Sequence, residues 1–334
     1  MSSAVVVDGP GRHRLVPHTP IAPGPGEARV RVHAVGICGS DREVHQGNRP
    51  AAYVRYPVTP GHEWSGVVEA VGDGTPAALM GRKVVGEGFR NCQVCERCHA
   101  GDTTLCTAGY EETGFTRPGA MAPTLTLPAR LLHVLPDGAD LTAAALLEPA
   151  ACVAAAALRA AAAPGARVAV VGTGTLGLLA VQILAAGSPA DLLVVGVDRE
   201  REPLAREFGA TAFLPHDAEL PADRDVVIEA AGSASAAGTA AALLRRGGRL
   251  VLTGLPAPGA AGLDPTDLVV RQLEVRTVFG APPDAWAHAV RLFAAGLLRP
   301  RPLVTHELPL ESFTEAIGLV ASGDPKVGKV LLRP

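Results

Sequence analysis

The pattern of hydrophobic and polar residues changes near residue 150 of this 334-residue chain. Before that point, short runs alternate apolar and polar residues, which is typical of half-buried strands. After it, continuous apolar runs alternate with stretches of helical composition, beginning with an Ala-rich segment from Ala151. We therefore expect residues 1–150 to form an all-β module with long functional loops. We expect residues 151–282 to form a parallel sheet covered by helices on both faces, an α/β arrangement.

The individual elements follow from the same pattern. The strands predicted for the first part are 28–35, 66–71 and 82–85. Those predicted for the second part are 167–171, 192–197, 225–229, 249–253 and 275–279. The Ala-rich helix should end at Pro164-Gly165, and a second helix is expected at 176–186. The tail, residues 283–334, predicts a helix at 285–296 and a closing strand at 327–332, but periodicity does not show which domain the tail joins.

Composition limits the kind of protein. Hydrophobic residues make up 48% and charged residues 19%, which indicates a globular chain rather than a disordered one. The net charge is −3 and the basic residues form no stripe, so nucleic acid is not an expected partner. The longest apolar stretch, 141–163, is interrupted by Glu148, Pro149 and Arg159, so no membrane span is predicted. The first residues lack a basic region followed by an apolar core, which favours the cytoplasm.

Four of the six cysteines fall within residues 90–107. Two residues separate Cys92 from Cys95 and Cys95 from Cys98, and Cys106 follows. In a reducing cytosol, thiols at this spacing favour a metal over a disulfide. Four thiolates suit tetrahedral Zn²⁺, so we expect a closed structural zinc site that stabilises this lobe and has no open position for substrate. A redox-active Cys-x-x-Cys pair and unrelated thiols are the alternatives.

A glycine-rich segment follows the predicted strand 167–171 and opens the next predicted helix. It reads Gly172-Thr173-Gly174-Thr175-Leu176-Gly177. Glycines at this spacing make a tight turn, admit a pyrophosphate close to the backbone and let the helix pack closely on the strand. The N-terminus of that helix offers free N–H groups to the phosphates. The segment therefore predicts a dinucleotide site, the alternative being a glycine-rich turn without a ligand.

Asp198 follows the next predicted strand, 21 residues after Gly177. Its carboxylate would accept hydrogen bonds from the adenosine ribose hydroxyls and repel a 2′-phosphate, which favours NAD over NADP. Arg199 and Arg201 follow directly, and an arginine there would instead pair with a 2′-phosphate. If both arginines are solvated turn charges, the preference for NAD stands, with NADP as the alternative.

A second group of possible metal ligands is spread along the first 150 residues. Cys38 lies in a predicted loop after the strand that ends near Val35. His62 and Glu63 follow 24 and 25 residues later, and Glu148 lies at the domain junction. Cysteine, histidine and carboxylate together suit a zinc that keeps an open position. Taken singly, the same residues also fit a buried thiol, a hydrogen-bonded histidine and a charge at a helix start.

Together these segments resemble the zinc-containing medium-chain dehydrogenase/reductases of the alcohol dehydrogenase superfamily, on the polyol and threonine dehydrogenase side. They occur in the family's order over nearly the whole chain: 36–41 with His45, 60–63, the four-cysteine lobe, 147–149 and the glycine segment. The resemblance implies a GroES-like catalytic domain (1–150), a Rossmann domain (151–282) and a C-terminal segment (283–334) that returns to the catalytic domain.

The resemblance also implies how the site works. Cys38 and His62 hold a catalytic zinc, with Glu63 and Glu148 at or next to the metal, and which of the two binds stays open. The metal polarises the substrate alcohol and the nicotinamide takes the hydride. Ser40 passes the alcohol proton through the nicotinamide ribose to His45, whose ordinary pKa near 6.5 suits proton exchange. A turn serine and a surface histidine are the alternatives for these two residues.

The substrate is less well specified. Segments 60–66 and 114–117 are similar to the 2-deoxy-scyllo-inosamine dehydrogenases of aminoglycoside biosynthesis, which oxidise a ring hydroxyl of an aminocyclitol. Aromatic residues make up only 4%, so a polar pocket is expected and a polyol, cyclitol or amino alcohol is preferred. Glu111, Glu112 and Arg117 are expected to be solvated loop charges rather than substrate contacts.

The sequence is also compatible with two rival functions, and it predicts an assembly. A biosynthetic ketone or aldehyde reductase that uses NADPH is the alternative within the family. A zinc-ribbon binding module without catalysis is the alternative from another class. Relatives of this kind are commonly dimers or tetramers, so a homo-oligomer is expected, with the strand 275–279 as the edge that pairs across subunits.

Overall fold

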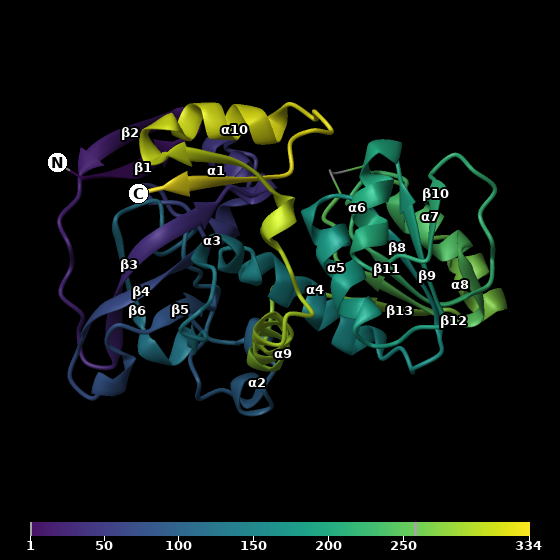
Figure 1. The fold of residues 1–334 in the computed structure, drawn as a ribbon, viewed down its shortest axis with the longest axis horizontal. Coiled ribbons are helices and arrows are strands. Elements are labelled where there is room, and N and C mark those ends of the chain that lie inside the picture. Colours follow the sequence, from purple (N-terminus) through teal and green to yellow (C-terminus); the bar gives the residue numbers. More distant parts are fainter. Residues whose placement is uncertain (1, 257–258) are drawn as a thin grey trace. The chain divides into compact units, whose positions relative to one another are not determined.

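The computed structural model describes residues 2–256 and 259–334, which divide into two compact units (Figure 1). The first, here called the β-rich unit, comprises Met1–Glu148, Pro282–Val290 and Pro300–Pro334. The second, the parallel-sheet unit, comprises Pro149–Ala281 and Arg291–Arg299. In the described ranges, no helix combines the length and the apolar character that a membrane crossing requires.

The β-rich unit is built on a sheet with the strand order β14-β15-β3-β4-β5-β7, in which β6 also pairs with β3, and on a separate β1–β2 hairpin. Along β3 the buried residues Ala28, Val30, Val32 and Ala34 alternate with more exposed ones, as the sequence pattern predicted. The strands are β1 (Ser3–Gly9), β2 (Arg12–Pro17), β3 (Glu27–Gly36), β4 (Glu63–Val71), β5 (Lys83–Gly86), β6 (Thr124–Pro128), β7 (Leu132–Val134), β14 (Val304–Pro309) and β15 (Lys329–Arg333).

The expectation of an all-β module was wrong, because helices interrupt this unit. They include α1 (Gly39–Gln46), α2 (Glu96–His99), α3 (Leu141–Ala144) and α10 (Phe313–Ala321). The segment after Cys38 was predicted as a loop but forms α1. Asp41 accepts a hydrogen bond from the Cys38 backbone N–H at 2.9 Å and so caps the helix start. Gly47 ends the helix in the left-handed region at φ 79°.

The C-terminal strand pairs with the middle of the β-rich sheet. β15 runs antiparallel to β3, with Leu331 opposite Gly36, and parallel to β14. α10 packs against both α1 and β15 (Figure 1). Phe313 of α10 and Trp64 of β4 are each 1% exposed and belong to the same apolar core. The end of the chain is therefore part of the framework on which Cys38 and His62 are placed.

The parallel-sheet unit has the strand order β10-β9-β8-β11-β12-β13, and every pair is parallel. This is the 3-2-1-4-5-6 order of doubly wound dinucleotide-binding sheets, and it confirms the predicted α/β class. The strands are β8 (Arg167–Val171), β9 (Asp191–Gly196), β10 (Ala212–Pro215), β11 (Arg224–Glu229), β12 (Leu244–Leu252) and β13 (Glu274–Thr277). The helices that lie wholly in this unit are α5 (Thr175–Ala185), α6 (Glu202–Glu207), α7 (Ala236–Ala242) and α8 (Pro265–Arg271). Those that begin in the β-rich unit and end in this one are α4 (Leu147–Ala160) and α9 (Pro283–Ala294).

Candidate zinc and dinucleotide sites

The predicted ligands Cys38, His62 and Glu63 lie together in the β-rich unit. One ligand atom from each lies within 4.8 Å of the others. Pairing of β3 with β4 places Gly36 opposite Glu63, so the segment leaving β3 meets the segment entering β4. His62 is 5% exposed and Glu63 1%, so the donors are shielded from water. Glu148, in the first turn of α4, lies outside this group of three, and its role as a ligand stays a prediction.

Asp41 orients this group, a role that was not predicted from the sequence. Its Oδ2 accepts from Cys38 N at 2.9 Å and its Oδ1 accepts from Gly61 N at 3.3 Å. The same Oδ1 lies 3.7 Å from His62 Nδ1, a buried atom without a hydrogen-bond partner. The available signal was the three-residue spacing from Cys38, which is that of a capping box.

The electrostatics of this group favour a cation. Burial opposes protonation of His62, but Asp41 and Cys38 outweigh it and raise the pKa of the imidazole well above 6.5. An environment that stabilises a positive charge between a thiol and a buried carboxylate also suits a divalent metal. Thiolate, imidazole and carboxylate are the donors of catalytic zinc sites, so the residues present fit the metal.

Lys329 of β15 was also missed, and it holds Glu63. Its Nζ lies 2.6 and 2.8 Å from the two carboxylate oxygens and donates to the Ile37 carbonyl at 3.2 Å. A Cβ at Gly36 would lie 2.3 Å from Glu63 Oε2, so glycine is needed at that position for the carboxylate to fit. Glu63 is thus already engaged in a buried ion pair at the edge of the proposed metal site.

The two predicted relay residues lie on α1. Ser40 Oγ is 3.5 Å from His62 Nε2, so the hydroxyl is next to the cluster. His45 lies farther along the helix, where its Nε2 faces Nδ1 of His13 at 3.1 Å. Burial and the charge of His13 lower the pKa of His45 below 6.5.

Glu112 is not the solvated loop charge that the sequence suggested. Its side chain is 7% exposed, 3.5 Å from Arg49, and hydrogen-bonded to the Tyr110 hydroxyl. Burial, with contributions from Glu148 and Asp41, raises its pKa to about 7 against the lowering effects of His62 and Arg49.

Phe115 connects this polar cluster to His62. The Arg49 guanidinium lies 3.7 Å from the centre of its ring, and the His62 ring centre lies 4.7 Å from it. In contrast, Arg117 pairs with Glu111 at 2.6 Å at partly exposed positions, as expected of loop charges.

The four-cysteine lobe brings its thiols together around α2. The Sγ atoms of Cys92, Cys95, Cys98 and Cys106 all lie within 4.8 Å of one another. The Cys92–Cys98 separation is 3.9 Å, close to the roughly 3.8 Å between sulfurs in a tetrahedron with 2.3 Å Zn–S bonds. Backbone N–H groups of Thr107 and Cys98 lower the pKa of Cys95 to about 5, while desolvation raises that of Cys98 to about 12. Neighbouring thiols are expected to differ in pKa in this way, because one thiolate repels the next. A divalent cation bound by all four sulfurs would offset that repulsion.

The glycine segment has the geometry that its spacing predicted. Gly172 has a φ of 118°, which an L side chain rarely adopts. A Cβ at Gly177 would lie 2.0 Å from the Gly172 carbonyl oxygen, so only glycine allows α5 to pack this closely. A Cβ at Gly174 would meet no protein atom within 4 Å, which leaves that face of the turn open to a ligand. Thr175 and Leu176 begin α5 directly after this turn.

Asp198 follows β9 and caps the short 3-10 helix Arg199–Arg201. Its Oδ1 accepts from Glu200 N at 2.8 Å. Its Oδ2 is buried without a hydrogen-bond partner, 3.9 Å from Arg201 Nε. Arg199 is exposed. A buried acceptor at the end of the second strand fits a donor such as a ribose hydroxyl.

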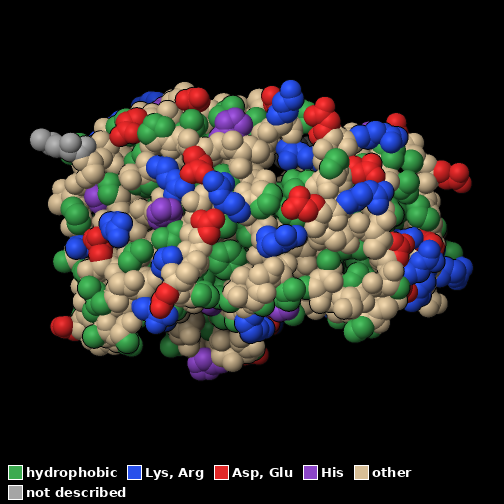
Figure 2. Space-filling model, viewed as in Figure 1, with side chains coloured by type: hydrophobic (Ala, Val, Ile, Leu, Met, Phe, Trp, Pro, Cys, Tyr) green, Lys and Arg blue, Asp and Glu red, His purple; other side chains and the backbone are tan. Residues whose placement is uncertain are grey.

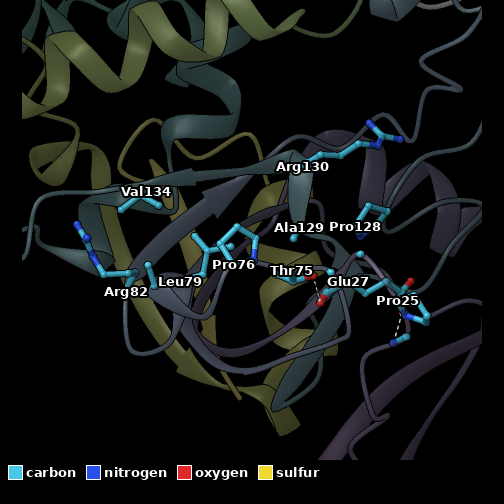
Figure 3. A pocket seen from close by; sticks show the side chains of 14 residues that line it. Pro25, Glu27, Thr75, Pro76, Leu79, Arg82, Pro128, Ala129, Arg130 and Val134 are labelled. Atoms are coloured by element: carbon cyan, nitrogen blue, oxygen red, sulfur yellow. Dashed lines mark hydrogen bonds between the residues drawn. The ribbon is translucent and has the colours of Figure 1, made fainter.

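A groove of about 1170 Å³ lies elsewhere in the β-rich unit and contains none of the predicted site residues. Figure 3 shows the apolar side chains of Pro76 and Leu79 between Arg82 and Arg130. On the face drawn in Figure 2, basic and acidic side chains are interspersed rather than gathered into a stripe.

Known proteins match both units. The family described as "Alcohol dehydrogenase GroES-like domain" matches residues 24–137, and "Zinc-binding dehydrogenase" matches residues 175–295. The 2-dehydro-3-deoxy-L-galactonate 5-dehydrogenase of Pseudoalteromonas atlantica is 32% identical over 323 residues, 93% of each chain. The L-threonine 3-dehydrogenase of Coxiella burnetii is 29% identical over 325 residues, 93% of this chain and 92% of that protein.

A solved structure extends the likeness to the whole fold. A zinc-binding dehydrogenase from Sinorhizobium meliloti, crystallised with NADP, has a TM-score of 0.91 and 28% identity, covering 100% of this chain and 99% of that one. The chain therefore belongs to the zinc-containing medium-chain dehydrogenase/reductases of the alcohol dehydrogenase superfamily, and it is an NAD(P)-dependent dehydrogenase of small-molecule alcohols with zinc as its metal.

Proposed function

We propose that the protein oxidises a secondary alcohol of a small polar substrate, a polyol, cyclitol or amino alcohol, to a ketone with NAD. The observation that carries this proposal is the group formed by the half-buried Cys38 and the buried His62 and Glu63, with Ser40 Oγ 3.5 Å from His62 Nε2. Donors for a catalytic metal and a hydroxyl able to take the alcohol proton are thus adjacent.

Cys38 and His62 would hold the catalytic zinc, with Glu63 or Glu148 as the carboxylate at or next to it. Zinc bound there would polarise the substrate hydroxyl, and the nicotinamide would accept the hydride. Asp41 fixes the orientation of Cys38 and His62 through its hydrogen bond and its close approach. Cys92, Cys95, Cys98 and Cys106 would hold a second, structural zinc.

In this proposal, residues of the chain also carry away the proton of the substrate hydroxyl. Ser40 would receive it from the substrate hydroxyl, and His45 would receive it by way of the cofactor ribose. A pKa below 6.5 keeps His45 neutral at neutral pH, and a neutral imidazole can accept a proton.

Gly172, Gly174, Gly177, Thr175 and Leu176 would contact the dinucleotide phosphates through the turn and the start of α5. The buried Oδ2 of Asp198 supports NAD over NADP, since a carboxylate repels a 2′-phosphate. Arg199 is exposed beside it, and its pairing with a 2′-phosphate is the competing possibility.

The polar substrate class has two supports. The relatives named above are dehydrogenases of threonine and of a deoxygalactonate. In addition, the buried side chains of Arg49 and Glu112, with the half-buried Tyr110, form a polar group that is linked to His62 through Phe115.

The test is a panel of polyols, aminocyclitols, threonine and simple secondary alcohols, each with NAD and with NADP. We expect the fastest turnover for a polar secondary alcohol with NAD, and its loss in Cys38→Ser but not in Cys152→Ser, a thiol outside both clusters. Faster ketone reduction with NADPH would instead identify a reductase. Failure to bind NADH in a fluorescence titration would contradict the proposed use of NAD.

We also propose that the protein is a homodimer or homotetramer. β13 forms one edge of the parallel sheet and pairs on one side with β12. An unpaired strand edge is a ready surface for a second copy of the same strand. A monomeric mass in sedimentation equilibrium would contradict this assembly.

A further inference from the structure

The imidazole of His45 is within hydrogen-bond distance of a second histidine, His13. Its Nε2 lies 3.1 Å from Nδ1 of His13, which comes from β2, 32 residues away in the chain. The other nitrogen of His13, Nε2, lies 3.2 Å from the Thr314 hydroxyl of α10. Thr314 is exposed, so an unbroken series of polar atoms runs from His45 to solvent.

The β1–β2 hairpin packs against α1, and this packing holds the rings of His13 and His45 in contact. Gly11 N donates to the His45 carbonyl at 2.7 Å. A Cβ at Gly47, which ends α1, would lie 2.6 Å from the Pro10 side chain, so the hairpin turn sits directly on the helix end. Figure 1 shows β1, β2, α1 and α10 gathered in one part of the β-rich unit.

Phe313 holds both imidazoles from one side. Its ring centre lies 5.0 Å from that of His13 and 5.6 Å from that of His45, both in edge-on arrangements. The His13 and His45 ring centres are 5.1 Å apart. Since Phe313 is 1% exposed, it fixes the rings and keeps water from that side of the pair.

Resting on the proposed function, we propose that His13 extends the proton path beyond His45, taking the proton from His45 and releasing it to solvent beside Thr314. An imidazole can gain a proton at one nitrogen while losing one from the other. A proton arriving at His45 Nδ1 is balanced by transfer from His45 Nε2 to His13 Nδ1 and by loss of one from His13 Nε2. The net result is one proton moved from substrate to water, and exchange with solvent restores the starting tautomers.

The electrostatic setting agrees with this path. Burial and the charge of His13 lower the pKa of His45, so the two rings resist carrying a proton at the same time. From α10, the neutral Phe313 and Thr314 face the pair. The other ionisable side chains on α1 and on the packed elements do not add to this shift: Asp8, Arg12, Arg14, Asp41, Arg42, Glu43, Glu311 and Glu315. His13 acts through His45 and is therefore a positioning residue rather than a catalytic one.

The test compares His13→Gln with His18→Gln. His18 follows the same strand and hydrogen-bonds a threonine, Thr124, at 2.8 Å, but it does not contact His45, so it is a matched control. In an NMR titration of the histidine ring protons, His13→Gln should raise the pKa of His45 and His18→Gln should leave it unchanged. This readout needs neither substrate nor cofactor.

In alcohol oxidation, His13→Gln should lower kcat on the order of tenfold in dilute buffer, less than the loss of a residue that takes the proton directly. KM should be unchanged, the acid limb of the pH profile should move up, and added imidazole should restore kcat. If His13→Gln has the same pH profile and the same His45 pKa as His18→Gln, the proposal is overturned. Loss of the acid limb in His45→Gln would still support the proposed function in that case. If no alcohol is oxidised, the proposed function fails, and an unshifted His45 pKa in His13→Gln then overturns the histidine pair independently.

Discussion

Replacing Lys329 with methionine should destabilise the β-rich unit, because the Glu63 carboxylate would remain buried without its cation. Nζ lies 2.6 and 2.8 Å from the two carboxylate oxygens, and the two side chains are 6% and 2% exposed. Burial acts to lower the pKa of Lys329, yet the charges of Glu63 and Cys38 outweigh it and raise the value. The ammonium is therefore held in its charged form beside the carboxylate.

The magnitude follows from this burial. In the metal-free protein, removing one partner of a buried ion pair costs about 3–5 kcal/mol, since the remaining charge has neither water nor a counter-ion. The Ile37 carbonyl also loses the donor 3.2 Å away, which adds about 1 kcal/mol. Methionine keeps the unbranched stem, so the loss of packing is small. We expect Lys329→Met to lower the free energy of unfolding by about 4 kcal/mol.

Tryptophan fluorescence in a urea titration measures this change selectively. The chain has two tryptophans, Trp64 and Trp286, which are 1% and 2% exposed and both belong to the β-rich unit. The control is Arg14→Met, which breaks an exposed pair with Asp8 (57% and 33% exposed) and should cost at most about 1 kcal/mol.

The double variant Glu63→Gln/Lys329→Met removes both charges of this pair and should recover most of the loss. If Lys329→Met unfolds at the same urea concentration as Arg14→Met, the ion pair is not desolvated and the reasoning fails.

Three further predictions test the separate sites. Gly177→Ala should abolish NADH binding and lower the melting temperature, because the new Cβ would lie 2.0 Å from a carbonyl oxygen. The new Cβ of Gly174→Ala would meet no protein atom within 4 Å, so this variant should bind NADH more weakly but keep its melting temperature. Titration and scanning calorimetry of both variants measure the two effects. Cys98→Ser should remove one of two zinc ions per chain by metal analysis and leave NADH binding intact; retention of both ions would exclude the four-thiolate site. His45 accepts a proton only when it is neutral, and its pKa is lowered below 6.5, so wild-type oxidation should fall in the pH range below 6.5. An unchanged pH profile in His45→Gln would remove His45 from the relay.

Local pattern was enough to predict the parallel sheet, because its strands are continuous apolar runs. The strand predicted at 167–171 is β8 with the same bounds, and the strand predicted at 275–279 is the edge strand β13 (Glu274–Thr277). β10 (Ala212–Pro215) was missed, since its apolar run Ala-Phe-Leu is only three residues long and ends at a proline, which is too short to distinguish a strand from a loop. The helix after Cys38 was missed because its eight residues contain a single aliphatic one, Val44, and its stability comes from the Asp41 cap and tertiary packing.

The residues that support the site could not be predicted from the local sequence pattern, because only tertiary pairing places them beside the site residues. Lys329 lies 266 residues from Glu63 in the chain, and Thr314 lies 301 residues from His13. The ladder that places Lys329 is short: β15 and β3 are paired only through Leu331–Gly36 and Leu332–Val35 in the described strands. Side chains alternate between the two faces of a strand, so a slip of one residue in this ladder would turn Lys329 away from Glu63. The register of one short strand pairing therefore decides whether the carboxylate beside the proposed zinc ligands has a partner, and no periodicity within either segment specifies that register.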